Sequence, residues 1–416
     1  MEPGDRVRIT RDDQRVEGIL LPSSTDDHLV LKRTGGYNVG IDRTRASVEL
    51  LESEAVSIDA TEPTTGEVST VHVDDDRPTI SLLSTGGTIA STVDYRTGAV
   101  SPRFDVEDVL RAVPELSGRA NYRGRIISNI LSENMRPSIW QELARAIAEE
   151  IESGADGVVV MHGTDTMQYS ASAVAFMLDS PVPIVFTGSQ RSADRPSSDN
   201  VMNAVCAVEA AMADHAETIV CMHAGASDDV CALHRGTRVR KNHTSQRAAF
   251  ETVGARPLGS ISYPDGKITW TDGTERTRRD ERELSVATAL ETDVELLKFT
   301  PGANPARVAS CDDLAGLVIE GTGLGHVNDD WLAAIRELPD DLPVVMTSQC
   351  LEGRICDRVY ETGRDLLAAG VIEAGDTLPE TALVKLMWAL ANVDDVGKIM
   401  GRSLAGELTD ASRPWS

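Results

Sequence analysis

Short segments that alternate between apolar and polar residues occupy the first part of the chain. Their sequences are GDRVRIT, RVEGILL, HLVLKR and YNVGI, and clusters of Gly, Asp and Ser separate them. A period of two is typical of half-buried β-strands, and several short strands with turn residues between them indicate a small β-barrel or sandwich. We therefore expect an SH3-like β-barrel domain over residues 1–52, followed by an acidic, Thr-rich linker over 53–77.

From Thr79 onward, strands that are apolar along their whole length alternate with helical patterns. Apolar residues recur every four positions from Ile139 to Ile151, and residues 200–214 favour a helix throughout. Continuous apolar strands separated by helices predict a parallel sheet that is covered on both faces, here in a domain over 78–275. The predicted strands are 79–85, 157–163, 183–188 and 217–225.

A charged stretch over 276–292 shows no clear buried strand, and we expect it to be a second linker. A further α/β domain over 293–416 is predicted to follow. Pro379 stands where a helix would have its first turn, a position at which proline is favoured. The predicted strands are 294–299, 315–320 and 343–347, and the predicted helices are 329–337 and 379–392.

The charge of the chain narrows its possible partners. The formal net charge is −26, and only six of the 40 basic residues are lysines, the other 34 being arginines. An acidic surface of this size argues against general nucleic-acid binding, which needs basic groups to neutralise phosphates. It fits work in a high-salt cytoplasm, where screening limits self-repulsion. A solvated acidic surface without functional meaning is the alternative interpretation.

The cysteines and the apolar runs indicate a cytoplasmic protein. The six cysteines lie in or beside apolar runs and show no C-x-x-C spacing, which favours a reduced protein without a metal site. No run approaches the roughly 18 apolar residues that a membrane span needs. The N-terminus lacks the basic and then apolar composition of a signal peptide, so we expect no membrane association.

Polar residues follow several predicted strands, where the carboxyl edge of a parallel sheet would gather them. They are Thr85-Gly86-Gly87-Thr88, His162-Gly163-Thr164-Asp165-Thr166, residues 187–199 and Lys241. Each has a purely structural alternative. The Gly-Gly pair can be turn chemistry, the Thr-Asp pair a helix cap, His162 a hydrogen-bonded core histidine and Lys241 a surface lysine. The Gly-Gly stretch matches neither a Walker loop nor the G-x-G-x-x-G fingerprint.

The chemical interpretation is a threonine nucleophile. A hydroxyl attacks only when a neighbouring base removes its proton, and a lysine can act as that base when a carboxylate orients it. Thr164, Lys241 and Asp165 provide a hydroxyl, an amine and a carboxylate. Gly87 and Gly163 would let backbone N–H groups approach a developing oxyanion. These groups suit acyl transfer.

The sequences TGGTIAS and HGTDTM, 76 residues apart from Thr88 to Thr164, together resemble the paired signatures of the type I–II asparaginase/glutaminase family. SENM at 132–135 and RKNHTSQRAAF, which contains Lys241, resemble further family segments. The resemblance covers about 78–416 and implies a two-domain asparaginase-type α/β fold with parallel sheets covered by helices.

The resemblance also implies roles for individual residues. Thr88 matches the attacking threonine, and Tyr95 matches a tyrosine on the mobile lid. Thr164, Asp165 and Lys241 match a second triad, in which Asp165 also binds the substrate's amino group. The remaining matches are Ser132 and Glu133, in the substrate-binding stretch. Glu133 departs from the family's usual glutamine, and an acidic group from a neighbouring protomer, which would complete the site, cannot be placed.

The additional N-terminal domain resembles that of the D subunits of archaeal-type Glu-tRNA(Gln) amidotransferases, as do DYRTGAV, SQRSADRPSSD and PETALVKLMWAL. This resemblance implies hydrolysis of the side-chain amide of Gln or Asn and transfer of ammonia to a partner E subunit. That partner would use ATP and Mg²⁺ and make most contacts to Glu-tRNA(Gln), while this chain would need no cofactor. A homodimer within a heterotetramer is implied. A free-standing L-asparaginase and a non-catalytic binding module are the alternatives.

Overall fold

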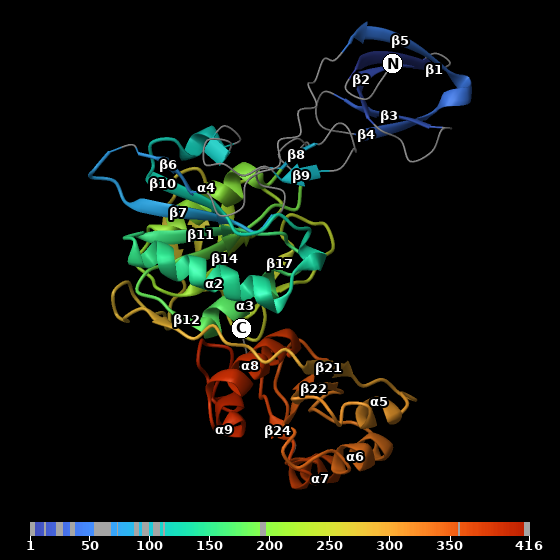
Figure 1. Ribbon diagram of the computed structural model, residues 1–416, viewed down its shortest axis with the longest axis vertical. Coiled ribbons are helices and arrows are strands. Elements are labelled where there is room, and N and C mark those ends of the chain that lie inside the picture. Colours follow the sequence, from blue (N-terminus) through green and yellow to red (C-terminus); the bar gives the residue numbers. More distant parts are fainter. Residues whose placement is uncertain are drawn as a thin grey trace.

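The computed structural model describes residues 5–11, 14–21, 28–33, 38–53, 68–72, 74–86, 91–93, 100–102, 109–110, 113–191, 197–356 and 358–411. Its first unit is a five-stranded antiparallel sheet of order β4-β3-β2-β1-β5, drawn in blue in Figure 1. Val7, Ile9 and Leu31 are almost fully buried within it. The alternation therefore predicted the strands, while closure into an SH3-like barrel stays a prediction. The strands are Arg6–Arg11, Gln14–Leu21, His28–Lys32, Asn38–Asp42 and Ala46–Glu52, with a short 3-10 helix at Arg43–Arg45.

A nine-stranded sheet forms the centre of the molecule, in the order β19-β18-β15-β14-β13-β11-β7-β10-β6. Five neighbours in its middle, from β14 to β10, run parallel. Strand β7 (Thr79–Ser84) lies between β11 (Gly157–Met161) and β10 (Asn121–Ile126). The other strands are β6 (Val68–Val71), β13 (Ile184–Thr187), β14 (Thr218–His223), β15 (Val230–Arg235), β18 (Gly259–Ser262) and β19 (Ile268–Trp270).

The predicted parallel sheet is confirmed in the centre, and antiparallel strands extend it at both edges. Strands β15, β18 and β19 pair antiparallel on one side, and β6 pairs antiparallel with β10 on the other. β6 lies inside the predicted acidic linker, so that segment is partly built into the sheet. Strands β6, β18 and β19 have only three or four residues each, and no helix separates β15, β18 and β19. Antiparallel neighbours need only a turn between them, so a pattern of apolar runs separated by helices does not reveal them.

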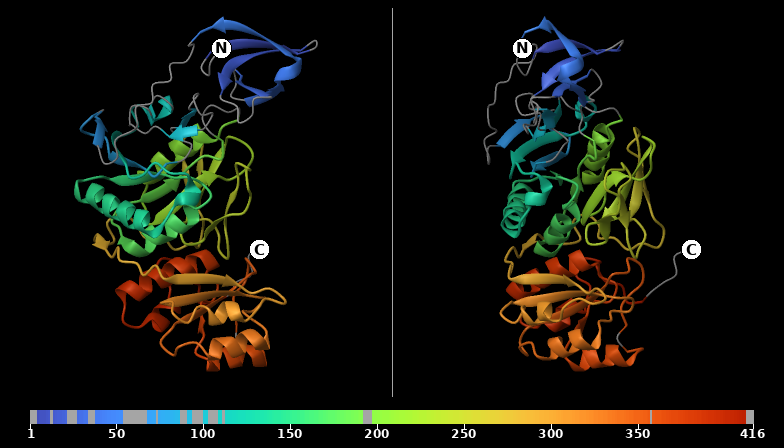
Figure 2. Two further views of the ribbon diagram at one scale, coloured as in Figure 1. Left: turned by 45° about the vertical axis from the view of Figure 1, so that its right-hand side comes forward. Right: turned by 90° about the vertical axis from the view of Figure 1, so that its right-hand side faces the viewer.

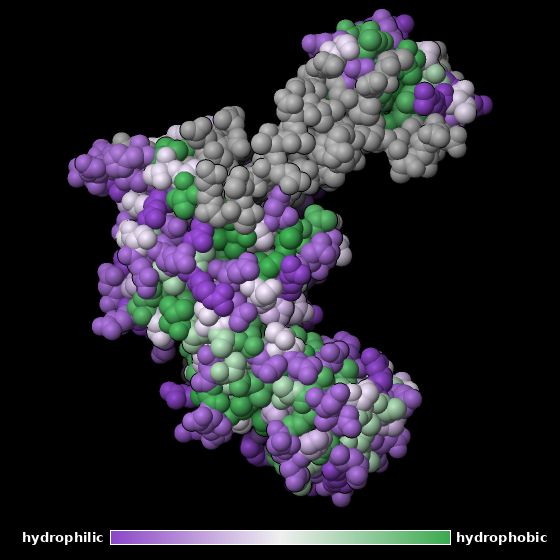
Figure 3. Space-filling model, viewed as in Figure 1, coloured by the Kyte–Doolittle hydropathy of each residue, from purple (hydrophilic) through white to green (hydrophobic). Residues whose placement is uncertain are grey.

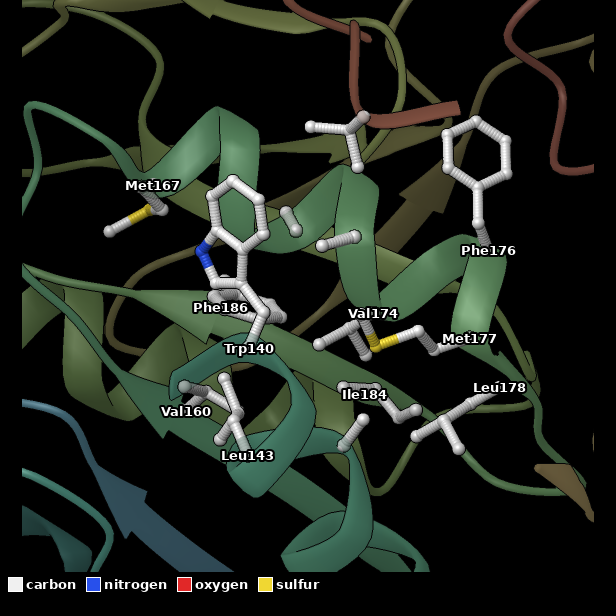
Figure 4. Close-up of a cluster of buried hydrophobic side chains, with 14 of the residues drawn as sticks. Trp140, Leu143, Val160, Met167, Val174, Phe176, Met177, Leu178, Ile184 and Phe186 are labelled. Atoms are coloured by element: carbon white, nitrogen blue, oxygen red, sulfur yellow. The ribbon is translucent and has the colours of Figure 1, made fainter. Parts of the chain in front are cut away.

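Helices cover both faces of the central sheet. Helix α2 (Pro137–Glu152) and helix α3 (Met167–Met177) pack on one face, and α4 (Asn200–Ala211) packs on the other. Figure 4 shows Trp140 and Leu143 of α2 beside Val174 of α3 and Phe186 of β13. The indole N–H of Trp140 donates to Ser170 Oγ at 2.8 Å, so the buried ring leaves no donor unsatisfied.

The C-terminal domain is a four-stranded parallel sheet of order β21-β22-β23-β24, covered by helices (Figure 2). The predicted helix at 379–392 is α8 (Pro379–Asn392), which also contacts α3 of the central domain. The remaining elements are β21 (Val294–Lys298), β22 (Gly316–Gly321), β23 (Val344–Ser348), β24 (Ile372–Glu373), α5 (Ala306–Ala309), α6 (Asp329–Arg336), α7 (Glu361–Ala368) and α9 (Val396–Met400).

Three two-stranded pairs and two further 3-10 helices complete the described fold. β12 (Leu178–Asp179) pairs with β20 (Ser285–Val286), which lies inside the predicted second linker. The others are β8 (Ser91–Val93) with β9 (Val100–Pro102), β16 (Val239–Lys241) with β17 (Phe250–Thr252), and 3-10 helices at Pro114–Leu116 and Ser132–Asn134. Among the described residues, no helix is both long and apolar enough to cross a membrane. On the face shown in Figure 3, hydrophilic residues are spread over both larger domains.

Candidate active site

The turn between β11 and α3 carries the first part of the site. The strand ends at Met161, and Thr164 and Asp165 follow before the helix begins at Met167. The residue in the N-cap position is Thr166, whose side chain does not cap the helix and instead donates to the carbonyl of Ser132 at 2.9 Å. Asp165 is therefore not the helix cap that the structural alternative proposed.

Lys241 reaches this turn from a separate strand, β16. Its Nζ donates to Thr164 Oγ1 at 2.9 Å and to Asp165 Oδ1 at 2.6 Å. The lysine side chain is only 9% exposed, whereas that of Asp165 is 65% exposed. Lys241 is thus not an ordinary surface lysine. An amine held between a hydroxyl and a carboxylate can move a proton to or from that hydroxyl.

Close packing brings residues 132–135 against this turn. A Cβ on Gly163 would lie 2.6 Å from the Cβ of Ser132, so only glycine lets the two segments approach this closely. Ser132 is buried and its hydroxyl lies 3.5 Å from Asp165 Oδ2, and Glu133 is exposed in the same short turn. The structure therefore brings Ser132, Thr164, Asp165 and Lys241 together.

The end of β7 lies at the same edge of the sheet. Ser84 is in register with Met161 of β11, and the N–H of Thr85 donates to the Met161 carbonyl at 3.1 Å. Gly86 has φ +108°, and a Cβ there would lie 2.2 Å from the carbonyl oxygen of Ile130. Gly87, Thr88 and Tyr95 lie outside the described residues. The roles of Thr88 as nucleophile and Tyr95 as lid residue stay predictions.

His162 is a buried, uncharged neighbour of the turn. Its Nδ1 lies 2.6 Å from the Gly163 carbonyl oxygen, and burial lowers its pKa to about 4. At neutral pH the ring is therefore neutral, and it holds the backbone that precedes Thr164. His162 is thus a hydrogen-bonded core histidine, which was its purely structural interpretation. Within the part of the chain that the structure describes, no group of three or more His, Cys, Asp or Glu side chains could hold a metal ion.

Sequence reasoning missed the residues that surround Lys241. The backbone N–H of Lys241 donates to Gln168 Oε1 at 3.4 Å, and Arg238 and Arg240 bind residues of the C-terminal domain. The sequence RVRK at 238–241 could have indicated them, because three basic side chains close together in an acidic chain are expected to pair with carboxylates. Their partners lie about 140 residues further along the sequence and could not be read from it.

Comparison with known proteins agrees with this architecture. The family described as "Asparaginase, N-terminal" matches residues 79–276, the "Glutaminase/Asparaginase C-terminal domain" matches 293–401, and the "GatD N-terminal domain" matches 1–51. The D subunit of a glutamyl-tRNA(Gln) amidotransferase from Halobacterium salinarum is 66% identical over 100% of this chain and 99% of its own. This chain belongs to the family of glutamyl-tRNA(Gln) amidotransferase D subunits.

More distant members of this D-subunit family are also similar over their full length. The protein of that name from Methanosarcina mazei is 50% identical, and the match covers 98% of each chain. The thermostable L-asparaginase from Thermococcus kodakarensis has a solved structure with a TM-score of 0.72 and 32% identity. The match covers 80% of this chain and 100% of that one, so the two larger domains have the asparaginase fold. The D-subunit family differs from it by an additional N-terminal domain.

Proposed function

We propose that this chain is the amide-hydrolysing component of a tRNA-dependent amidotransferase. The observation that carries the proposal is Lys241 Nζ, placed between Thr164 Oγ1 and Asp165 Oδ1. This arrangement occurs in a chain whose relatives are named as amidotransferase D subunits over their whole length. The buried amine and its two partners supply the base and the orienting carboxylate that a hydroxyl nucleophile requires.

The proposed reaction has two steps. The Thr88 hydroxyl attacks the side-chain amide of Gln or Asn, forms an ester and expels ammonia, which takes up the proton that the hydroxyl loses. Water then cleaves the ester and returns the free threonine and a carboxylate. Thr164, Lys241 and Asp165 move the protons, Tyr95 closes over the nucleophile, and the backbone at Gly87 and Gly163 faces the oxyanion. Ser132, Glu133 and Asp165 bind the amino-acid end of the substrate.

The ammonia serves a partner in this proposal. The partner E subunit activates Glu-tRNA(Gln) with ATP and Mg²⁺, and ammonia converts the activated carboxyl group into the amide of Gln-tRNA(Gln). This chain then needs no cofactor, meets tRNA mainly through its partner, and works in the cytoplasm as a homodimer within a heterotetramer. Its net charge of −26 is consistent with leaving tRNA binding to the partner.

Co-purification with the E subunit from the same cell tests the assembly. The purified complex should convert Glu-tRNA(Gln) in a reaction that depends on glutamine. Thr88→Val and Thr164→Val should each abolish amide hydrolysis and leave the unfolding midpoint in place. A variant that keeps near-full activity would remove that threonine from the mechanism.

A free-standing L-asparaginase is the second candidate, favoured by the asparaginase structure that matches 80% of the chain. Strong asparagine hydrolysis by the isolated chain, unchanged by partner or tRNA, would support it. The match covers the whole of that asparaginase but only 80% of this chain. The additional N-terminal domain of this chain favours the amidotransferase.

A further inference from the structure

The strand that carries Lys241 is not part of the nine-stranded sheet. In the described residues, β16 pairs with β17 alone, through Val239 with Thr252, Arg240 with Glu251 and Lys241 with Phe250. A two-stranded pair is marginally stable by itself. The position of the lysine amine, which must lie within hydrogen-bond reach of Thr164, therefore depends on what else holds this strand.

The C-terminal domain holds it from one side through Arg238. The Arg238 side chain is 1% exposed, and its Nη1 and Nη2 donate to the carbonyl oxygen and Oδ2 of Asp376 at 2.9 and 3.1 Å. Its Nε donates to the carbonyl oxygen of Gly406 at 3.0 Å. Asp376 accepts in turn from the N–H and hydroxyl of Thr409. Three guanidinium nitrogens are thus fixed by two segments of the other domain.

The residue before Arg238 adds neutral contacts to the same domain. The Thr237 hydroxyl donates to the carbonyl oxygen of Ala405 at 2.8 Å, and its own carbonyl oxygen accepts from the Thr381 hydroxyl at 3.2 Å. Thr381 belongs to the first turn of α8, which packs against α3. The residues that precede β16 are therefore held in place by the C-terminal domain.

Arg240 forms the contact nearest to the lysine. Its Nη1 lies 3.3 Å from Oε2 of Glu380, whose side chain is 4% exposed in the first turn of α8. Burial raises the pKa of Glu380, and the nearby Arg240 charge opposes that rise. The other carboxylate oxygen, Oε1, is buried and has no hydrogen-bond partner in the described part of the chain. Arg240 is thus the cation that offsets this buried acid.

We propose that Arg238 and Arg240 are positioning residues for Lys241, so that the C-terminal domain of the same chain sets the geometry of the base. Successive side chains of a strand point to opposite faces. Arg240 faces α8, and Lys241 faces Thr164 on the opposite side of the strand. Contacts that fix the strand through Arg240 therefore also fix the direction in which Lys241 points. The inference rests on the proposed function, because it takes Lys241 to be the base. A base misplaced by about 1 Å can lose on the order of 10²-fold in rate.

The test uses the full-length chain in complex with its partner. Arg240→Gln and Glu380→Gln should each lower kcat for glutamine hydrolysis by about 10-fold or more, with KM changed much less. Arg240→Lys should restore part of the loss, because it keeps the charge. Asn392→Ala is the matched control, since it removes a hydrogen bond at the far end of α8, to Ala289 in the linker, and does not touch β16. It should lower the unfolding midpoint and leave kcat unchanged.

A second measurement does not depend on activity. Acetic anhydride labels lysine amines, and mass spectrometry can follow each of the six lysines separately. Lys241 should be labelled faster in Glu380→Gln than in the unaltered chain, while the exposed Lys267 and the buried Lys385 should not change. Glu380→Gln preserves the size of the side chain, so it answers the question even if Arg240→Gln does not fold.

The outcomes separate the two proposals. If the unaltered complex hydrolyses glutamine and the folded variants keep both its kcat and its Lys241 labelling rate, the positioning role is wrong. If the unaltered complex hydrolyses no amide at all, the proposed function is wrong. The labelling of Lys241 in the variants then still decides whether Arg240 and Glu380 hold the strand.

Discussion

Two lysine–carboxylate pairs in this molecule have the same separation and opposite surroundings. Lys241 Nζ lies 2.6 Å from Asp165, and Lys385 Nζ lies 2.6 Å from Glu407. Both members of the second pair are fully buried, whereas Asp165 is 65% exposed. Lys385 also donates to the carbonyl oxygens of Met400 and Arg402, while Glu407 accepts from the N–H groups of 404 and 405.

The difference between the pairs shows what makes an ion pair available for chemistry. The hydrogen-bonding groups of Lys385 and Glu407 are occupied by fixed backbone partners, so neither can serve a substrate. Lys241 instead has a side-chain hydroxyl as its other partner, and Asp165 opens to solvent. One pair is closed within the C-terminal domain, and the other leaves a hydroxyl and an exposed carboxylate beside its amine, as the proposed proton transfer requires.

The largest effect should come from removing the amine of Lys241, whose pair with Asp165 opens to solvent and is called the open pair below. Lys241→Met should lower amide hydrolysis by about 10²- to 10⁴-fold, the contribution of a positioned general base. The unfolding midpoint should change little because Asp165 remains solvated. Single-turnover hydrolysis of glutamine measures the loss, and Lys267→Met, at an exposed lysine, is the control. A Lys241→Met enzyme with more than a tenth of the original activity contradicts the assignment.

The same substitution in the buried pair of Lys385 and Glu407, called the closed pair, should lower stability rather than activity. Lys385→Met leaves Glu407 buried without its cation, which typically destabilises a protein by about 3–5 kcal/mol. Urea unfolding followed by circular dichroism measures this change in free energy. In the folded fraction, where residues 405 and 406 still bind Thr237 and Arg238, glutamine hydrolysis should keep the original rate. A lower rate in fully folded protein would mean that the two pairs are coupled.

Acid should destabilise the central domain, including the residues around the open pair of Lys241 and Asp165. Burial lowers the pKa values of His162, His215 and His234 to about 4, from about 6.5 in the unfolded chain. The folded state therefore binds fewer protons between these values, so stability is complete above pH 6.5 and falls as the pH drops towards 4.

The expected loss is up to about 3 kcal/mol for each histidine. His162 precedes Thr164, and Nδ1 of His234 lies 2.8 Å from the hydroxyl of Thr252, which is paired with β16. Urea unfolding at a series of pH values from 7.5 to 4 measures the loss, and His234→Gln should reduce it. An unfolding free energy that stays constant over this range would contradict the burial of these rings as neutral groups.

Salt should have the smallest effect on the comparison. Screening acts on exposed charges far more than on buried ones, so the stability change caused by Asp165→Asn, at most about 1 kcal/mol for such a pair, should shrink as KCl is added. The change caused by Lys385→Met should stay constant. The unaltered chain, with its net charge of −26, should gain stability in KCl. Full stability in dilute buffer would contradict adaptation to high salt.

The sequence predicted those parts of the fold and site whose causes are local. Continuous apolar runs gave β7 and β11, and the polar residues after β11 include Thr164 and Asp165. Lys241 could be singled out because lysines are rare in this chain. Nothing local shows that Lys385, within an apolar helix, would meet Glu407, or that Arg238 would meet Asp376. Such pairs depend on how distant segments and domains dock, which no short-range pattern encodes.

The anchoring of Arg238 by Asp376 and Gly406 has a consequence for the order of events during synthesis. Chains emerge from the ribosome N-terminus first, and their domains fold in that order. Thr164 and Lys241 are both made before Asp376 and Gly406, so the contacts that hold the strand of Lys241 cannot form until those later residues have been made. A nascent central domain therefore carries Thr164, Asp165 and Lys241 before the C-terminal domain can hold the strand of Lys241 in place.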